Sequence, residues 1–367
     1  FSEESINMAS KRTYWAITAL GIGPEGTADG AGITTAEYLH GVQSVGISTT
    51  FNLEQVFQLG QLEIYQDVEE VPDIEISIEK VLDDTATAYQ RAIGQPTVVS
   101  GTATADQSTG GTVLTLTGVQ NNKCDAYLTI HPDTAENAGD AGTGKNAESY
   151  VWCSGMYVSS VSFNFPVDGN FTESVTLVGN HKKWYAGGAT KILANAPTTG
   201  SLDTGDIMKR HNFEFETIPA SIQPAGADDG FKGDAVVQNV SVSTDFGREA
   251  INALGTKLPY HRYVTFPVEV TCDIEVVIND AKAQDIDALP LRDSNLTEES
   301  IKIKVWDEHQ NDATGIQGGA STLRHTIDLG DKNKVTSITY GGGDTGGGNA
   351  TYSYSYRNFN KLNYNYG

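Results

Sequence analysis

Two stretches of the chain alternate apolar and polar residues with a period of two. Residues 73–79 read DIEISIE, and residues 268–275 read VEVTCDIE. Successive side chains of a β-strand point to opposite faces of a sheet, so each stretch predicts a strand with one buried and one solvated face. The acidic residues of the two solvated faces are Asp73, Glu75 and Glu79 in the first stretch and Glu269, Asp273 and Glu275 in the second.

Strand-like patterns also dominate the rest of the chain. Thr, Val and Tyr favour strands and are plentiful, whereas long apolar repeats of helical period are absent. The predicted strands lie near 42–47, 62–68, 97–119 (two strands), 124–131, 149–165, 171–180, 235–244, 257–264, 267–278, 300–306, 321–329, 334–340 and 350–357. Short helices are predicted at 85–93 and 283–289, and Leu53 to Gly60 fits either a short helix or an extended turn.

The two alternating stretches belong to a longer internal repeat. Residues 42–72 align with residues 237–267 without a gap. Identical pairs include Val42 and Val237, Gln43 and Gln238, Val45 and Val240, Phe51 and Phe246, Glu54 and Glu249, Gly60 and Gly255, Tyr65 and Tyr260, and Pro72 and Pro267. The match continues after one inserted residue, and 159–163 and 168–177 resemble 336–340 and 347–356. Because the pieces keep their order, we infer a duplicated domain.

This repeat predicts a mainly β protein with two tandem modules, each a small β-sandwich or partly closed barrel with one short helix. Residues 1–41 are interpreted as an N-terminal arm, and residues 42–190 as the first module. Residues 191–236 are interpreted as a linker and connecting segment, and residues 237–367 as the second module with a C-terminal arm.

The charge of the chain excludes several classes of partner. With 24 Lys and Arg against 47 Asp and Glu, the formal net charge is −23. Proteins that bind nucleic acid through its phosphates need basic patches, so specific DNA or RNA binding is not expected. The sequence contains no apolar run of membrane-spanning length, and we expect no membrane partner.

Motifs for chemistry are weak. Residues 21–26, GIGPEG, fit the dinucleotide pattern GxGxxG, but Pro24 interrupts it; residues 139–146, GDAGTGKN, are one residue from a phosphate-binding loop. The seven His and three Cys lack the spacings of a metal site, and no GxSxG nucleophile motif is present. We therefore predict no catalytic residues, no cofactor, no metal and no enzymatic activity.

The strings GVQSVGISTTFNLEQVFQLGQLEIYQDVEEVPDIEISIEKVLD and VSSVSFNFPVDGNFTESVTLVGN resemble the tail tube proteins of tailed bacteriophages. The resemblance covers both modules and is one of pattern: a V-x-x-V-x-I-x-x-x-F strand, a Gly turn, a Pro-led alternating strand and an N-x-T-E-S-V hairpin. It implies a tail-tube-like β-sandwich whose copies join their sheets into a β-barrel ring. Stacked rings would form the conduit for genome ejection.

The same resemblance implies a virion protein made in the bacterial host cytoplasm, in contact with other tail proteins. The common family member carries one such fold and forms hexameric rings, so a duplicated chain is expected to close a pseudo-sixfold ring with three copies. A true hexamer is the alternative. The six acidic residues named above are expected to line the lumen, where they would repel DNA; a plain solvated face is the alternative.

Other functional classes remain open at this point. A baseplate hub, a head decoration protein or a receptor-binding virion protein would be a binding module. An injection-system tube or a surface-layer subunit would assemble in a different setting.

Overall fold

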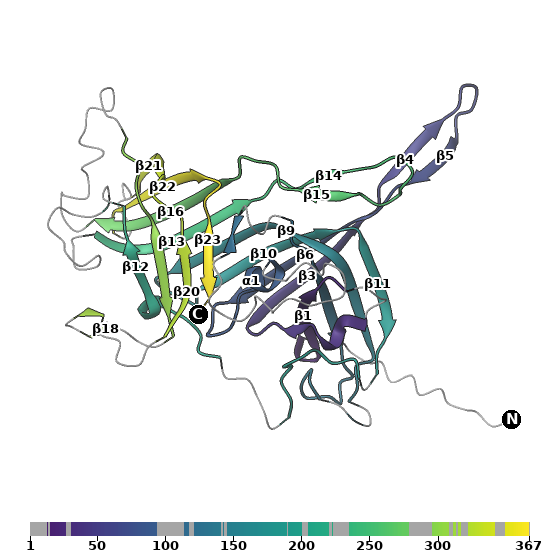
Figure 1. Ribbon diagram of the computed structural model, residues 1–367, viewed down its shortest axis with the longest axis horizontal. Coiled ribbons are helices and arrows are strands. Elements are labelled where there is room, and N and C mark those ends of the chain that lie inside the picture. Colours follow the sequence, from purple (N-terminus) through teal and green to yellow (C-terminus); the bar gives the residue numbers. More distant parts are fainter. Residues whose placement is uncertain are drawn as a thin grey trace.

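A computed structural model gives the structure of the protein (Figure 1). It describes residue 13, residues 15–26, 31–93, 114–116, 121–140, 142, 145–188, 190–199, 205–219, 222, 235–278, 296–307, 311–312, 315–316, 322–341 and 349–366. Within these ranges the protein is mainly β, with several antiparallel sheets and one α-helix, α1 (Ala88–Ile93). The prediction of a mainly β fold is confirmed.

The largest sheet has twelve strands and branches at the long strand β9. One line of eight antiparallel strands runs in the order β3 (Val42–Thr50), β6 (Asp73–Val81), β10 (Thr172–Gly179), β9 (Ser149–Pro166), β13 (Ala235–Asp245), β16 (Glu269–Ile278), β22 (Thr351–Phe359) and β21 (Lys334–Gly341). The N-terminal half of β9 pairs instead with β8 (Cys124–Ile130) and β11 (His181–Ala186). Beyond β8 lie β1 (Thr18–Pro24) and β2 (Glu37–Tyr38).

A second sheet and three short hairpins complete the described strands. The second sheet has the order β12 (Phe213–Thr217), β17 (Lys302–Trp306), β20 (Leu323–Asp328), β23 (Asn363–Tyr366) and β7 (Leu114–Thr115). The hairpins are β4 (Leu53–Phe57) with β5 (Ile64–Glu69), β14 (Glu249–Ile251) with β15 (His261–Tyr263), and β18 (Asn311–Asp312) with β19 (Gly315–Ile316). Short 3-10 turns lie at Trp15–Ile17, Ala31–Thr34 and Arg210–Asn212.

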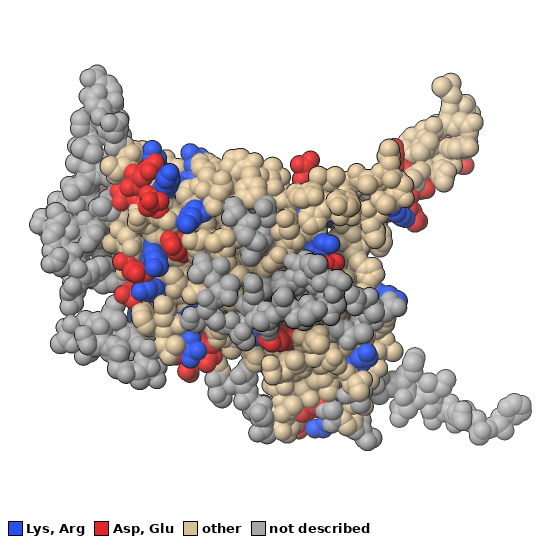
Figure 2. Space-filling model, in the orientation of Figure 1, with Lys and Arg blue, Asp and Glu red and all other residues tan. Residues whose placement is uncertain are grey.

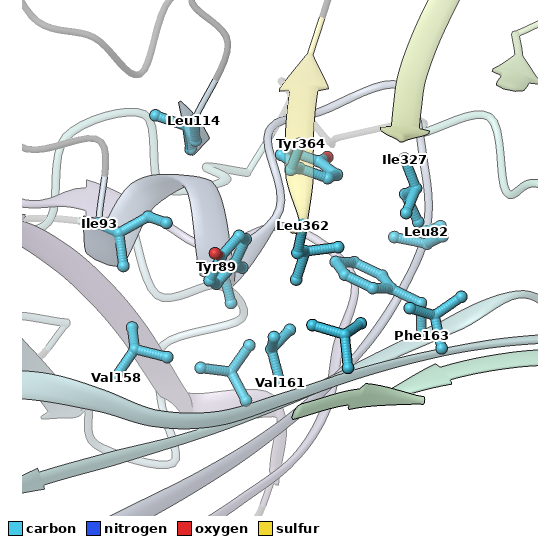
Figure 3. Packing of buried hydrophobic residues seen from close by; sticks show 14 of the residues in the cluster. Leu82, Tyr89, Ile93, Leu114, Val158, Val161, Phe163, Ile327, Leu362 and Tyr364 are labelled. Carbon is cyan, nitrogen blue, oxygen red and sulfur yellow. The ribbon is translucent and has the colours of Figure 1, made fainter. Parts of the chain in front are cut away.

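The core lies between one face of the eight-stranded line and a cover made of α1 and the second sheet (Figure 3). Tyr89 of α1 and Tyr364 of β23 meet Phe163 of β9, and the Phe163 and Tyr364 rings stack with centroids 5.6 Å apart. All three side chains are fully buried. Aromatic residues contribute large apolar areas to a core, so this contact fixes the cover on the sheet.

Glu173 of β10 ties the helix to the sheet. Its two carboxylate oxygens accept hydrogen bonds from the backbone N–H groups of Ala88 and Tyr89, each at 2.8 Å. These are first-turn N–H groups, which have no partner inside a helix. The side chain is fully buried, and this burial raises the pKa of Glu173 from an ordinary 4.5 to about 7.

The internal repeat of the sequence recurs as a repeat of strand pairing. Val45 lies opposite Ile78, and the aligned residue Val240 lies opposite Ile274. The register slips by one residue at Gln43 in β3 and at the aligned residue Gln238 in β13. The pairings β6–β10 and β10–β9 match β16–β22 and β22–β21 in the same way, including a second slip at Ser159 and Thr336. The line of eight strands is thus four strands repeated once.

Several local expectations change with the structure. Leu53 to Gly60 begins with strand β4 instead of a helix, because it pairs with β5. Part of the predicted N-terminal arm forms β1, which pairs along its whole length with β8, and Asn363–Tyr366 of the C-terminal arm form β23. Both segments pair with strands of the chain's own sheets. Part of the predicted linker forms β12. The helix expected at 283–289 lies outside the described residues, and the division into two modules stays a prediction.

The buried carboxyl of Glu173 predicts a pH-dependent stability. Because its folded pKa is raised from 4.5 to about 7, the stabilisation is fully present below the lower value and is lost as pH rises through the higher one. We expect the unfolding free energy of the wild type to fall relative to Glu173→Gln by on the order of 3 kcal/mol between about pH 4 and about pH 8. Urea unfolding of both proteins at the two pH values measures this, and parallel pH profiles would contradict it.

Candidate functional site

The face of the eight-stranded line opposite the core is lined mainly by small hydroxyl side chains and carboxylates, with the cations Lys334 and Arg357 at one end of β21 and β22. Since the side chains of paired residues share a face, the registers place them together. The hydroxyl residues on this face are Ser44, Ser48, Thr50, Ser77, Ser174, Thr176, Ser160, Ser162, Ser241, Ser243, Thr271, Ser353, Ser355, Ser337 and Thr339. We call this surface the polar face.

All six acidic residues predicted from the sequence lie on the polar face. Asp73, Glu75 and Glu79 are exposed on β6 while the intervening Ile residues are buried. On β16, Glu269 and Asp273 are exposed and Glu275 is half-buried, opposite buried Val, Cys and Ile residues. Three strands, β10, β9 and β13, separate the two acidic strands. The structure therefore brings two predicted acidic rows onto one continuous surface.

The polar face is concave where the two repeats meet. A shallow hollow of about 550 Å³ lies over β10, β9, β13 and β16, with Ser162, Ser174, Ser243 and Asp245 among its lining residues. Short polar side chains in a shallow hollow offer few contacts to a large polar molecule that approaches it. It contains no arrangement of nucleophile and base.

The line of eight strands ends in two open edges among the described strands. β3 pairs only with β6, and β21 pairs only with β22. In the repeat, β13 corresponds to the edge strand β3, and β9 corresponds to the edge strand β21. Inside the line, β13 and β9 pair with each other over seven residue pairs, from Asn239 opposite Pro166 to Asp245 opposite Ser160. Open edges present unpaired backbone N–H and C=O groups and invite pairing with another strand.

Two hairpins leave the same end of the line and correspond to each other in the repeat. We call residues 51–72, with β4 and β5, the first hairpin, and residues 246–268, with β14 and β15, the second hairpin. They share one register, since Gln55 opposite Asp67 matches Ala250 opposite Arg262. Their tips are fully exposed at Leu59 and Leu254.

A polar cluster fixes the second hairpin onto the first repeat. The Arg262 guanidinium pairs with the Asp73 carboxylate and donates to Asn180 Oδ1 at 3.1 Å. Asn52 donates to the other Asp73 oxygen at 3.0 Å. Partial burial acts to raise the pKa of Asp73, but the hydrogen bonds from Asn52 and Arg262 outweigh it and hold this pKa below its ordinary value. The sequence did not indicate this cluster, because its residues come from four separate segments.

A cleft of about 290 Å³ lies beside this cluster, between the second hairpin and the ends of the sheet strands. Inside it, the Tyr157 hydroxyl lies 2.8 Å from His261 Nδ1. The Arg248 guanidinium lies over the Tyr157 ring, 5.0 Å from its centroid. These contacts join the hairpin to β9 and are better explained as a docking interface than as a catalytic site.

The weak chemical motifs do not converge. Gly21 and Gly23 of the GxGxxG pattern lie inside strand β1, where a Cβ on Gly21 would lie 2.5 Å from Leu193. Cys124, Cys153 and Cys272 are buried and free, and burial raises their thiol pKa values. Within the described ranges, no group of three His, Cys, Asp or Glu residues could hold a metal ion. No helix in the same ranges is long and apolar enough to cross a membrane.

Comparisons with known proteins add no relative. The chain matches no protein-family model, and a search of curated proteins finds no similar sequence. Four features of the chain bear on its function: the sequence pattern, the two open edges, the polar face and the paired hairpins.

The Arg262 cluster predicts a specific loosening of the second hairpin. In Arg262→Ala, the ion pair with Asp73 is lost, and the hairpin keeps fewer contacts with the first repeat. We expect backbone amides of 249–263 to exchange with deuterium about five to ten times faster, equivalent to roughly 1 kcal/mol. Hydrogen exchange with mass spectrometry measures the effect. The control is Glu249→Ala, on the exposed side of the same hairpin; equal exchange in both variants would contradict the assignment.

Proposed function

We propose that this chain is a self-assembling tube subunit, a tail tube protein of a tailed bacteriophage, whose copies join their sheets edge to edge around a lumen. The single observation that carries the proposal is the pairing of β9 with β13. It joins the last strand of one four-stranded repeat to the first strand of the next. Repeating this joint between chains would pair β21 of one copy with β3 of another.

The pairing of β9 with β13, called here the internal joint, also specifies the register of the proposed pairing between chains, called the joint between chains. Ser162 lies opposite Ser243 in the internal joint. The residues that take their places in the repeat are Thr339 on β21 and Ser48 on β3. Applied to the open edges, the same register places Thr339 of one copy opposite Ser48 of the next, with Gly341 opposite Gly46.

The burial of the edge residues supports this joint. Phe163 of β9 is 1% exposed, whereas the corresponding Tyr340 of β21 is 57% exposed. Val240 and Val242 of β13 are buried, whereas the corresponding Val45 and Ile47 of β3 are only half-buried. The apolar residues at both open edges are those that a neighbouring copy would cover, which favours association through the hydrophobic effect.

Three copies suit the duplicated chain, because a six-part ring would then have pseudo-sixfold symmetry. Three lines of eight strands give 24 strands. With a spacing of about 4.8 Å and a tilt of about 40°, a closed barrel of this size has a diameter of roughly 50 Å. The polar face would form the inner wall, and α1 with the second sheet would lie outside. The proposed role requires no cofactor and no catalysis, and it places the protein in the virion.

Cysteine cross-linking tests the joint between chains. In antiparallel pairs, opposite Cα atoms lie about 4.5–5.5 Å apart, within the range of a disulfide. We expect Ser48→Cys with Thr339→Cys to give covalent multimers on a denaturing gel under oxidising conditions, up to a closed three-chain species. Ser48→Cys with Ser353→Cys is the control, since Ser353 lies one strand further in. Failure of the first pair to cross-link above the control would reject the proposed joint.

The acidic residues of the polar face predict how the lumen treats DNA. Replacement of Glu75, Glu79, Asp273 and Glu275 with Lys puts cations on the proposed inner wall without touching the open edges. We expect assembly to persist and DNA to be retained, with binding that weakens steeply as salt rises, because each phosphate contact adds about 0.9 to the slope of log K against log salt.

Gel-shift titration of assembled particles with linear duplex DNA measures this retention. The matched control replaces the same four residues with Gln or Asn, which removes charge without adding cations. Assembled Lys variants that bind DNA no better than the control would argue against a lumen lined by this face.

A further inference from the structure

The two corresponding hairpins carry opposite charge. The first hairpin contains Glu54, Glu63, Asp67, Glu69 and Glu70 and no Lys or Arg. The second hairpin contains Arg248, Lys257 and Arg262 and one carboxylate, Glu249. Both hairpins have the same register and turn geometry, with Gly60 and Gly255 at φ 89° and 88°. The opposite charges therefore do not change how the hairpins fold, and we relate them to the surfaces that each hairpin contacts.

The surroundings of the two hairpins differ as well. The second hairpin lies across the strand ends of the first repeat, where Arg262 contacts Asp73 and His261 contacts Tyr157. The first hairpin extends past the open edge β3, away from the body of the chain (Figure 1). Figure 2 shows acidic atoms along its lower part and an uncharged tip. A neighbouring copy joined at β3 would offer it the strand ends of a second repeat.

Those strand ends carry cations at the positions of Tyr157 and Val178 in the first repeat, where a nearby cation is Lys123, 5.7 Å from the centroid of the Tyr157 ring. Lys334, the residue that corresponds to Tyr157, begins β21 and lies directly opposite Arg357 of β22. Both side chains are exposed. Arg357 has a carboxylate at 3.9 Å in Glu269, the residue that corresponds to Asp73. Like charges opposite each other on neighbouring strands are destabilising. A further carboxylate near the Lys334–Arg357 pair, which lies at an open edge, would reduce this repulsion.

We propose that the first hairpin of one copy docks across the strand ends of the second repeat of the neighbouring copy, with Asp67 at the Lys334–Arg357 pair. This inference rests on the proposed ring. Asp67 corresponds to Arg262, so the joint between chains has an acid on the hairpin and cations on the sheet, the reverse of the joint within a chain. Placed on a first repeat, the first hairpin would set Asp67 against Asp73 beside Tyr157 and Val178. Placed on a second repeat, it would meet Glu269 together with the cations Lys334 and Arg357. The charges therefore select the alternating order of repeats around the ring.

A charge-swap cycle on the full-length protein tests this docking. We expect Asp67→Lys alone and Lys334→Asp alone each to raise the concentration needed for half-maximal assembly by about tenfold, because like charges then meet at the interface. The double variant should recover most of this loss. Glu54→Lys makes the same change in charge on the side of the hairpin that corresponds to the exposed Glu249, and it should assemble like the wild type.

Sedimentation velocity over a concentration series measures the assembled fraction in each variant. Assembly of the wild type with no rescue in the double variant would overturn the docking and leave the ring intact. A wild type that stays monomeric throughout would reject the ring and the docking with it.

A cross-link provides a second readout that does not depend on affinity. Because the native cysteines are buried, introduced thiols react without competition. Asp67→Cys with Lys334→Cys should give disulfide-linked chains, whereas Glu54→Cys with Lys334→Cys should give few. Equal yields in the two pairs would contradict the proposed orientation of the hairpin.

Discussion

The pairing of β9 with β13 joins the two four-stranded repeats into one sheet. Strand β9 is 18 residues long, and its two halves serve different neighbours: β8 and β11 on one half, β10 and β13 on the other. Because β9 and β13 pair without a slip, the second four-stranded repeat continues the first with its faces aligned. A shift of one residue would move the polar side chains of one repeat onto the core side.

The same sheet has to satisfy opposite demands on its two faces. One face buries large apolar groups such as Phe163 and Val240 beneath α1 and the second sheet. The other face carries mainly hydroxyls and carboxylates, and its contacts are polar, such as the ion pairs of Asp73 with Arg262 and of Glu269 with Arg357. Under the proposed function this contrast is required, because a conduit needs a rigid wall and a surface with little affinity for its cargo. Screening limits repulsion to roughly 8–10 Å at physiological salt, so the carboxylates would act only on what comes close to the wall.

Much of the sheet could be predicted from the sequence, because period-two alternation and the internal repeat both report on strands. The alternation placed Ile74 and Glu75 on the correct faces of β6. The aligned strands have equal registers in the structure, with slips at Gln43 and Gln238. The alternation along β10 also indicates a buried acid, because Glu173 lies two residues from the apolar Val175 and therefore on the same, buried face of the strand.

Other features depend on contacts that no local pattern encodes. Strand β12 lies in the predicted linker and pairs with β17 about 90 residues later, although its own sequence, FEFET, alternates Phe with Glu. Strand β1 is fixed by β8, about 100 residues away. The cluster of Asn52, Asp73, Asn180 and Arg262 depends on how the second hairpin lies over the first repeat. The opposite charges of the two hairpins were visible in the sequence, but their meaning depends on the direction in which each hairpin projects.

Under the proposed function, the strand pairing that joins the two repeats within a chain is also the pairing that joins one chain to the next. Electron microscopy of the purified protein, with class averages computed without imposed symmetry, tests it most directly. We expect closed rings or stacked tubes whose end views have threefold symmetry and six similar lobes. Particles that remain single chains, or rings with true sixfold symmetry, would contradict it.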